Sequence, residues 1–401
     1  MTEAAPSGAP GPATQPLGAP GRVVYLDHGA TSWPKPPEVI EAMATAMREQ
    51  GANPGRGAYP MALAASRVVF ESRRACADLL GVPDSRDVAF LSGCTEACNL
   101  MLKGLLSPGD RVVVSSMEHN AITRPLHVLS QQGIAVEVVT ADRAGLVDAL
   151  DVERAVKAAP TKAVVCQHAS NVTGAIQPIA DLADIAHENG ALLLVDGAQG
   201  GGHLAIDLAG LDVDAYAVSG HKGLLGPQGV GLLYLRPGLD VRELCQGGTG
   251  GSSSEQDAQP QGRPERYEAG TPNTPGIAGL GAAVRLLAEH GAAWRAEEQR
   301  LFLILKEGLL AIPGVTVHGP ALHEPSVPIV CITHDRIDPD RISFMLDRRA
   351  GVAVRAGLHC APWAHRTIGT LDTGAVRFGV GHGTTEDDIR IALAALAEVL
   401  A

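Results

Sequence analysis

Short apolar runs rich in β-branched residues alternate with longer amphipathic stretches from residue 23 onward. This alternation is typical of a parallel β-sheet covered by helices. Near-continuous apolar runs, such as residues 192–195, indicate strands that are buried on both faces. The predicted strands are 87–91, 111–115, 135–140, 163–167, 191–195, 215–218 and 229–235, and the predicted helices between them are 65–80, 96–105, 121–132 and 179–188. The pattern therefore predicts an α/β fold around a mainly parallel sheet of seven strands.

The pattern changes after residue 235. Residues 247–254 read GGTGGSSS and lead into a polar stretch, which predicts a mobile loop over 247–265. A helical pattern from 276 to about 312 is followed by expected strands near Val315 and at 328–333, and by a closing helix at 386–400. We therefore expect a disordered Pro/Gly/Ala-rich tail over 1–22. A large α/β domain should follow over 23–265, and 266–401 should hold the long connecting helix and a smaller α+β C-terminal domain.

Composition narrows the class of protein. The 401 residues include 32 Lys and Arg against 44 Asp and Glu, a net charge of −12, and only 3% are aromatic. A nucleic-acid ligand is therefore not expected, because it needs a basic face or a stacking platform. No apolar run is long enough to span a bilayer, and no signal-peptide pattern is present, so we expect no membrane partner. Seven scattered cysteines without regular spacing predict a reducing, cytoplasmic location.

A lysine and an aspartate follow two of the predicted strands. Lys222 lies in SGHK after strand 215–218, and Asp196 directly follows the apolar run 192–195. The carboxyl ends of strands in an open parallel sheet are where ligands bind. A Schiff-base lysine paired with an aspartate at a pyridine nitrogen is the combination of pyridoxal phosphate enzymes. Taken singly, each residue is more often a solvated lysine or a turn aspartate.

A phosphate cradle is the next requirement of such a site. Residues 92–96, SGCTE, lie between a strand and a helix, where backbone N–H groups would hold a dianion, although an ordinary Thr95 N-cap explains them equally well. Cys94 and Cys98 have no second pair at zinc spacing, so we expect them to pack in the core and predict no metal site. The GIAGLG run from Gly276 lacks a preceding strand, so dinucleotide binding is not supported.

Eight motifs, in order, connect the chain to a known family. They are YLDHGATS from Tyr25, SGCTEACN from Ser92, MEHN from Met117, HASNVTG from His168, VDGAQ from Val195, SGHKGLLGPQGVG from Ser219, YEAGTPNT from Tyr267 and RAGLHCAP from Arg355. Over about residues 23–400 the chain resembles the class V aminotransferase family, the fold-type I pyridoxal phosphate enzymes that include cysteine desulfurases.

The resemblance implies a role for each motif residue. Lys222 is the Schiff-base lysine, Asp196 contacts the pyridine nitrogen, Gln199 contacts the ring hydroxyl, and His119 stacks on the ring. Thr271 reaches the phosphate from a neighbouring subunit, which implies a homodimer. Asn171 and Arg377 bind the substrate, Arg377 as a bidentate carboxylate ligand. The implied cofactor-binding residues are Cys94, Thr95, His119, Asn171, Asp196, Gln199, Ser219, His221, Lys222 and Thr271, and the implied catalytic residues are Lys222, Cys360 and His119.

Cys360 selects among the reactions of the family. It lies in RAGLHCAP, where His359 and Arg355 are expected to favour the thiolate. A small buried hydrophobe is the alternative. The segment resembles the catalytic loop of group II cysteine desulfurases and selenocysteine lyases, but this chain has Leu358 and Asn120 where many members have histidine.

The sequence therefore predicts a pyridoxal phosphate-dependent cysteine desulfurase. It would convert L-cysteine to L-alanine and pass a persulfide from Cys360 to an acceptor protein or a small thiol. A selenocysteine lyase acting on L-selenocysteine, and an aminotransferase or epimerase, remain as alternatives on the same cofactor. A catalytically silent scaffold is an alternative from another class, because fold does not fix function.

Overall fold

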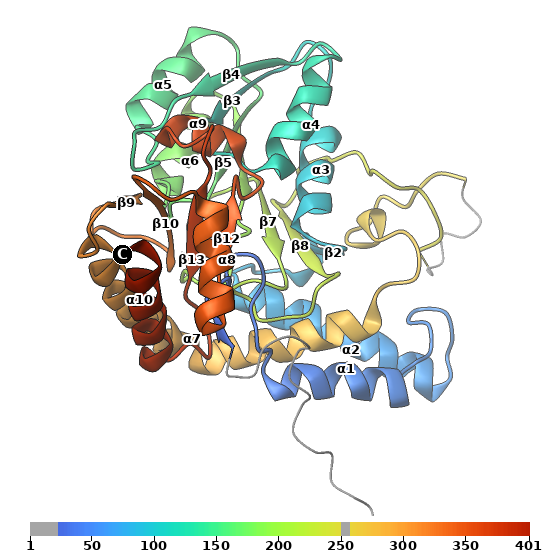
Figure 1. Cartoon of the computed structure of the whole chain (residues 1–401). Helices are drawn as coiled ribbons and strands as arrows, with labels where there is room; N and C mark the ends of the chain where they lie inside the picture. Colours follow the sequence, from blue (N-terminus) through green and yellow to red (C-terminus); the bar gives the residue numbers. More distant parts are fainter. Residues whose placement is uncertain (1–22, 250–256) are drawn as a thin grey trace, which may run out of the picture.

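The computed structural model describes residues 23–249 and 257–401 (Figure 1). The predicted tail 1–22 and the middle of the predicted loop, 250–256, lie outside the described residues. The main sheet has seven strands in the order β2-β8-β7-β6-β5-β3-β4. In that order they are Val88–Leu91, Gly231–Leu235, Ala215–Ser219, Leu192–Asp196, Ala163–Gln167, Arg111–Ser115 and Ala135–Val139.

Most neighbours in this sheet are parallel. β7, β6, β5, β3 and β4 form a continuous parallel ladder, and β8 pairs antiparallel with both β7 and β2. The predicted α/β fold with a mainly parallel seven-stranded sheet is confirmed. Because the five parallel strands point the same way, their carboxyl ends share one edge, where residues after β5, β6 and β7 can meet.

Two helical layers cover the sheet. Alternate residues of a strand face opposite sides, so Leu193 and Val195 of β6 pack in one apolar cluster and Leu194 in another. The first cluster contains residues of α2, α5, α6 and the first half of α7, and the second contains those of α3 and α4. These helices are α2 (Pro60–Leu79), α3 (Cys94–Leu105), α4 (Asn120–Ser130), α5 (Ala149–Ala158), α6 (Ile179–Glu188) and α7 (Thr274–Leu310). Helix α1 (Pro37–Glu49) packs against α7.

Helix α7 connects the two cores, as the 276–312 pattern predicted. Asn273 caps its start by accepting a hydrogen bond from the Gly276 N–H at 3.1 Å. Leu280 and Leu287 pack in the core of the large domain, whereas Phe302 and Leu309 pack in that of the small domain. One rigid helix therefore fixes the small domain relative to the sheet.

The small domain contains an antiparallel sheet in the order β12-β13-β10-β9, covered by α8 and α10. Its elements are β9 (Val315–His318), β10 (Ile329–His334), α8 (Pro339–Ala350), β11 (Val352–Ala353), β12 (Arg355–Gly357), α9 (Pro362–Ile368), β13 (Ala375–Gly379) and α10 (Glu386–Leu400). Short 3₁₀ turns occur at Ser85–Asp87 and Glu265–Tyr267.

The first described strand, β1 (Val24–Tyr25), does not join the large domain to which residues 23–265 were assigned. It pairs in parallel with β11, and Val24 and Leu26 are buried in the apolar core of the small domain. The physical reason is that both residues need an apolar surface, which the small sheet provides. The chain then crosses to α1, so residues 27–35 lie between the two domains, beside the edge of the main sheet.

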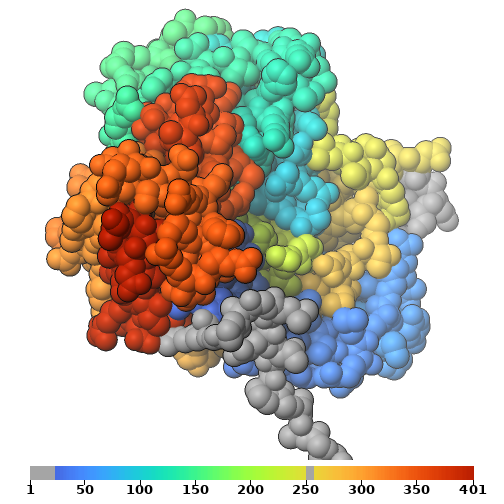
Figure 2. All heavy atoms as spheres, viewed as in Figure 1, coloured from blue at the N-terminus to red at the C-terminus, as the bar shows by residue number. Residues whose placement is uncertain are grey.

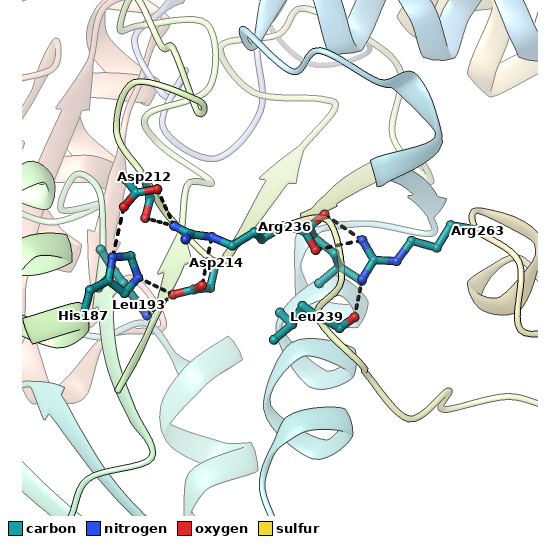
Figure 3. A network of polar contacts seen from close by, with 8 residues as sticks. His187, Leu193, Asp212, Asp214, Arg236, Leu239 and Arg263 are labelled. Carbon is teal, nitrogen blue, oxygen red and sulfur yellow. Dashed lines mark hydrogen bonds and ion pairs between the residues drawn. The ribbon is translucent and has the colours of Figure 1, made fainter. Parts of the chain in front are cut away.

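A polar network ties β6, β7 and the chain after β8 together (Figure 3). Asp214 accepts hydrogen bonds from the Leu193 N–H at 2.7 Å and from His187 at 2.8 Å, and it pairs with Arg236 at 3.0 Å. His187 and Arg236 also contact Asp212. The network lies at the amino ends of β6 and β7, opposite the edge where ligands are expected, so its role is to hold these strands in register.

The described end of the predicted mobile loop is anchored. Arg263 pairs with Asp87 at 2.9 Å and donates a hydrogen bond to the Leu235 carbonyl. It also donates to the carbonyl groups of Arg236 and Leu239 (Figure 3). Gln259 is buried and accepts from the Gly247 N–H at 3.0 Å. No helix in the described part of the chain is long and apolar enough to cross a membrane.

Candidate active site

A cavity of about 430 Å³ lies at the carboxyl edge of the main sheet. It is bounded by the ends of β5, β6 and β7, by the start of α3, and by residues of the small domain. All the predicted site residues except Cys360 and Thr271 line it: Cys94, Thr95, His119, Asn171, Asp196, Gln199, Ser219, His221, Lys222 and Arg377. The fold therefore brings together motifs that are spread over nearly 300 residues of sequence.

The start of α3 provides an anion-binding surface. The helix begins at Cys94 without a side-chain cap at Gly93, so the first N–H groups have no partner within the helix. The chain can approach this closely because β8 carries Gly231, where a Cβ atom would lie 2.6 Å from the Gly93 Cα. With the Thr95 hydroxyl and Ser219 also on the lining, this corner suits a phosphate group.

Asp196 ends β6 and is 4% exposed. Its Oδ1 accepts a hydrogen bond from the Ala198 N–H at 2.9 Å and one from the Cys94 thiol at 3.4 Å. The Cys98 sulfur is 3.9 Å from that of Cys94. Among the described residues, these three form the single cluster of possible metal ligands. The hydrogen bond from Cys94 to Asp196 accounts for their proximity without an ion.

Lys222 follows β7, and its ammonium group makes no hydrogen bond or ion pair with the rest of the described chain. Burial lowers the Lys222 pKa, and Asp196 partly opposes the shift. The turn that carries it is fixed from the interdomain segment, because the His221 carbonyl accepts bonds from the Ser32 N–H at 3.0 Å, the Thr31 hydroxyl at 3.0 Å and Lys35 Nζ at 2.9 Å. The lysine is therefore well placed and more readily neutral than a surface lysine.

Two histidines on the lining are neutral at pH 7. Burial lowers the His119 pKa to about 4, against an opposing effect of Asp196, and burial also lowers that of His221 to about 4. His119 is the N-cap of α4, where its Nδ1 accepts from the Ala121 N–H at 3.0 Å. That bond places the His119 proton on Nε2.

Three buried polar atoms on the lining have no hydrogen-bond partner in the described structure: Asn171 Oδ1, Gln199 Oε1 and Arg377 Nε. The other end of each side chain is fixed, since Gln199 Nε2 donates to the Gly29 carbonyl at 2.8 Å and Asn171 Nδ2 to the His359 carbonyl at 2.8 Å. Buried polar groups are seldom left unpaired. These atoms, with the free helix start and Asp196, fit a bound molecule that has a phosphate, polar ring substituents and a carboxylate.

Arg377 is 1% exposed and already has partners. Its Nη2 pairs with Asp27 at 2.7 Å and its Nη1 donates to the Asn171 carbonyl at 3.1 Å. Gly29 makes room for it, since a Cβ there would lie 3.1 Å from the guanidinium carbon. A bidentate carboxylate would therefore have to use Nε together with a second N–H of a terminal nitrogen.

Cys360 lies just outside the cavity lining and is solvent-exposed. Arg355, which does line the cavity, places Nη2 3.5 Å from the Cys360 sulfur. The expectation that His359 favours the thiolate of Cys360 was wrong. Both of its ring nitrogens form hydrogen bonds elsewhere, one with His365 and one with the Arg355 carbonyl. Burial lowers the His359 pKa to about 3, so the ring carries no charge beside the thiol.

The sequence model of the family described as aminotransferase class V matches residues 24–391. The chain belongs to the class V aminotransferase family. The resemblance inferred from the eight motifs is therefore confirmed.

Class V relatives of this chain share most of its length. A probable cysteine desulfurase from Methanothermobacter thermautotrophicus is 34% identical over 391 residues, 94% of each chain. One from Pseudomonas aeruginosa is 35% identical over 389 residues, again 94% of each. Solved structures of cysteine desulfurases from Thermococcus onnurineus and Escherichia coli match with TM-scores of 0.84 and 0.83, each at 30% identity and 94% of both chains.

The two departures from the class V pattern occupy the surroundings of Cys360. The backbone N–H of Asn120 donates to the Cys360 carbonyl at 2.8 Å, so this link does not need a histidine side chain. Leu358 is 36% exposed beside it. Thr271 is exposed and lines a neighbouring pocket of about 250 Å³, which shares Ser92 and Glu96 with the main cavity.

Sequence reasoning missed Glu118, which is fully buried behind the cavity. Burial raises its pKa to about 8, although the Ser115 hydroxyl donates to Oε1 at 2.5 Å. Its Oε2 has no partner in the described structure. The MEHN motif contains this residue, but a single acidic letter after a strand does not distinguish a buried carboxyl from a surface one.

Proposed function

We propose that this protein is a pyridoxal phosphate-dependent cysteine desulfurase with Cys360 as the sulfur-accepting residue. The observation that carries the proposal is the exposed Cys360 thiol held by Arg355 at the rim of a cavity suited to a phosphate-bearing ring. The names of the class V relatives and solved structures above support the same activity. Aminotransfer or epimerisation would require no thiol at this place.

The lining residues would hold the cofactor in a defined orientation. The start of α3, Thr95, Ser219 and His221 would bind its phosphate, with Thr271 contributed by a second subunit. Asp196 would keep the pyridine nitrogen protonated, Gln199 would accept from the ring hydroxyl, and His119 would cover one ring face. Pyridoxal phosphate, when bound there, supplies an electron sink for the bonds broken in the substrate.

Lys222 and Cys360 would perform the steps that the chain itself carries out. The lowered pKa of Lys222 makes its neutral amine available to take a proton from the substrate Cα and to return one. The Cys360 thiolate attacks the substrate sulfur, so a sulfur–sulfur bond forms and the carbon–sulfur bond breaks. The electron pair stays with the carbon skeleton, which takes up protons and leaves as alanine. The products are alanine and a Cys360 persulfide, which then passes its outer sulfur to an acceptor protein or thiol.

Asn171 and Arg377 would hold L-cysteine. Arg377 Nε is unpaired and would bind the carboxylate, while Asp27 keeps the guanidinium plane in place. Asn171 Oδ1 is also unpaired and would accept from a donor of the bound molecule. Since none of these groups contacts the sulfur, they would accept L-selenocysteine equally well, which leaves selenocysteine lyase as the second candidate.

A homodimer is part of the proposal. Large apolar side chains on or beside α1 and α2 are at least half exposed, a clustering unusual for a monomer surface. They are Ile40, Met47, Tyr59, Met61, Leu63 and Phe70. These helices lie along one edge of the molecule, the blue region in Figure 2. All seven cysteines are free thiols, which supports the expected cytoplasmic location.

The test is a product analysis. Purified protein is mixed with pyridoxal phosphate, L-cysteine and a reducing thiol, and alanine, sulfide, keto acid and D-cysteine are measured. The proposal requires alanine and sulfide in equal amounts, with no reaction by Lys222→Ala. A keto acid without sulfide would indicate an aminotransferase, and D-cysteine alone an epimerase. Parallel measurement with L-selenocysteine compares the two chalcogen substrates.

A further inference from the structure

A chain of buried polar side chains lies beneath the loop that carries Cys360. His359, His365 and Thr370 are 2%, 0% and 4% exposed. His359 Nδ1 is 3.0 Å from His365 Nε2, and His365 Nδ1 is 2.7 Å from the Thr370 hydroxyl. At the other end, His359 Nε2 is 3.1 Å from the Arg355 carbonyl oxygen. The roles proposed above for the cofactor and substrate use none of these three side chains.

The hydrogen bonds that link these side chains can run in only one direction. The Arg355 carbonyl can only accept, so His359 carries its proton on Nε2 and accepts on Nδ1. His365 therefore donates from Nε2 to His359, and its Nδ1 accepts from the Thr370 hydroxyl. A second proton on His359 Nδ1 would set two N–H groups against each other, so the His359 ring must be neutral. The His365 pKa of about 4 leaves that ring neutral as well.

The surroundings keep the two rings neutral. The charged or titratable groups that face them are Arg355, Arg377 and His318, and the Cys331 thiol lies 4.0 Å from His359 Nδ1. No carboxylate pairs with either ring in the described structure. Burial lowers the pKa of His359 to about 3 and that of His365 to about 4.

The backbone at His359 and Cys360, which lies above these hydrogen-bonded side chains, has an uncommon conformation. His359 and Cys360 have φ values of 51° and 57°, in the left-handed region that non-glycine residues rarely adopt. Their carbonyl groups are held by the Asn171 amide at 2.8 Å and by the Asn120 N–H at 2.8 Å. The His359 ring below provides a further attachment, and that ring is fixed by His365.

We propose that His365, supported by Thr370, is a positioning residue for Cys360. It orients the His359 ring, and the ring maintains the left-handed backbone that holds the thiol beside Arg355 at the rim of the cavity. The inference deepens the proposed function and rests on Cys360 being the persulfide carrier. The alternative is that the stacked rings, 5.2 Å apart at 24°, serve only as packing in the core.

The test compares four variants of the full-length protein loaded with pyridoxal phosphate. His365→Ala removes the N–H that donates to His359, whereas His365→Gln keeps an amide N–H that can reach His359. Thr370→Val removes the hydroxyl that donates to His365. Thr367→Val is the matched control, because Thr367 lies on the same helix and bonds to Trp363 and Ser116 outside the chain. We expect kcat for alanine formation to fall ~10-fold or more in His365→Ala, with KM changed by less than about twofold. His365→Gln and Thr370→Val should lose less, and Thr367→Val nothing.

A second readout separates positioning from loss of thiol chemistry. Cys360 and Cys245 are the exposed cysteines of the described chain, so Cys245 is an internal reference for alkylation. In His365→Ala, iodoacetamide should modify Cys360 at least as fast relative to Cys245 as in the unmutated protein, while persulfide formation on Cys360 falls with kcat. A core-packing role would instead lower the melting temperature and leave kcat of the folded fraction unchanged.

Failure of the positioning role can be distinguished from failure of the proposed function. If the unmutated protein forms no persulfide on Cys360, the proposed function fails. If it does, and His365→Ala retains full turnover, only the positioning role fails. Should His365→Ala not fold, full turnover of Thr370→Val would equally overturn the inference.

Discussion

Arg355 Nη2 lies 3.5 Å from the sulfur of Cys360, and the two residues are presented from the strand β12 and the loop that follows it. Arg355 also lines the cavity, whereas Cys360 does not. The guanidinium therefore links the thiol to the place where the substrate would bind. Its positive charge lies beside the sulfur that would act as the nucleophile.

Replacing Arg355 by methionine should slow sulfur transfer to Cys360. Without the contact between Arg355 Nη2 and the Cys360 sulfur, the thiol is no longer held at the rim of the cavity, so kcat for alanine formation should fall ~10-fold or more. Arg366→Met, an exposed arginine on α9, is the control and should change nothing. An unchanged kcat in Arg355→Met would show that the contact has no role in placing the thiol.

Asp196→Asn should retain cofactor but lose activity. The amide cannot balance a protonated pyridine nitrogen, so kcat should fall by ~100-fold or more if this is a main electrostatic contribution. The measurement is alanine formation with a cofactor absorbance spectrum recorded on the same sample. Asp372→Asn, at an exposed aspartate, is the matched control. Turnover within about threefold of the unmutated protein would reduce Asp196 to a turn residue.

Buried ionisable groups predict a stability optimum. His28, His119, His168 and His221 have pKa values lowered by burial to between about 3 and about 4, from 6.5. The unfolded chain binds protons first as pH falls, so the free energy of unfolding should decrease from about pH 6.5 down to about pH 4. Denaturant titrations across this range measure it. A constant free energy would contradict the assigned burial of these rings.

Burial of Glu118 makes the free energy of unfolding depend on pH in the opposite direction. Its pKa is raised from 4.5 to about 8, so the unfolded carboxyl loses its proton first and stability is lost as pH rises from 4.5 through about 8. Glu118→Gln should therefore gain stability relative to the unmutated protein across that interval, and the exposed Glu137→Gln should not. A difference between Glu118→Gln and the unmutated protein that does not change with pH would contradict this account.

The sequence was sufficient to predict the main sheet and most residues of the cavity lining. Buried parallel strands have a clear apolar pattern, and the site residues follow the carboxyl ends of these strands. It missed α5, whose apolar face shows only Val152 and Val156 as buried residues. It also missed β13, which contains the buried charge of Arg377.

Contacts between side chains that are distant in the sequence could not be predicted from it. Asp27 and Arg377 pair across 350 positions, and Cys94 reaches Asp196 only because α3 and β6 pack together. The orientation of His359 away from Cys360 also depends on His365, six residues later and on another element. Proximity in sequence indicated a charged neighbour for the thiol, but the packing decides which neighbour faces it.

The central claim is that sulfur from cysteine is transferred to Cys360, and one measurement tests it most directly. The unmutated protein and Cys360→Ala, both loaded with pyridoxal phosphate, are exposed to L-cysteine without reductant and then analysed by peptide mass spectrometry. The account predicts one added sulfur on the peptide containing Cys360, none on those containing Cys245, Cys94 or Cys98, and loss of sulfide release in Cys360→Ala although cysteine still changes the cofactor spectrum. Full activity of Cys360→Ala on L-cysteine, with no added sulfur on Cys360 in the unmutated protein, would contradict it.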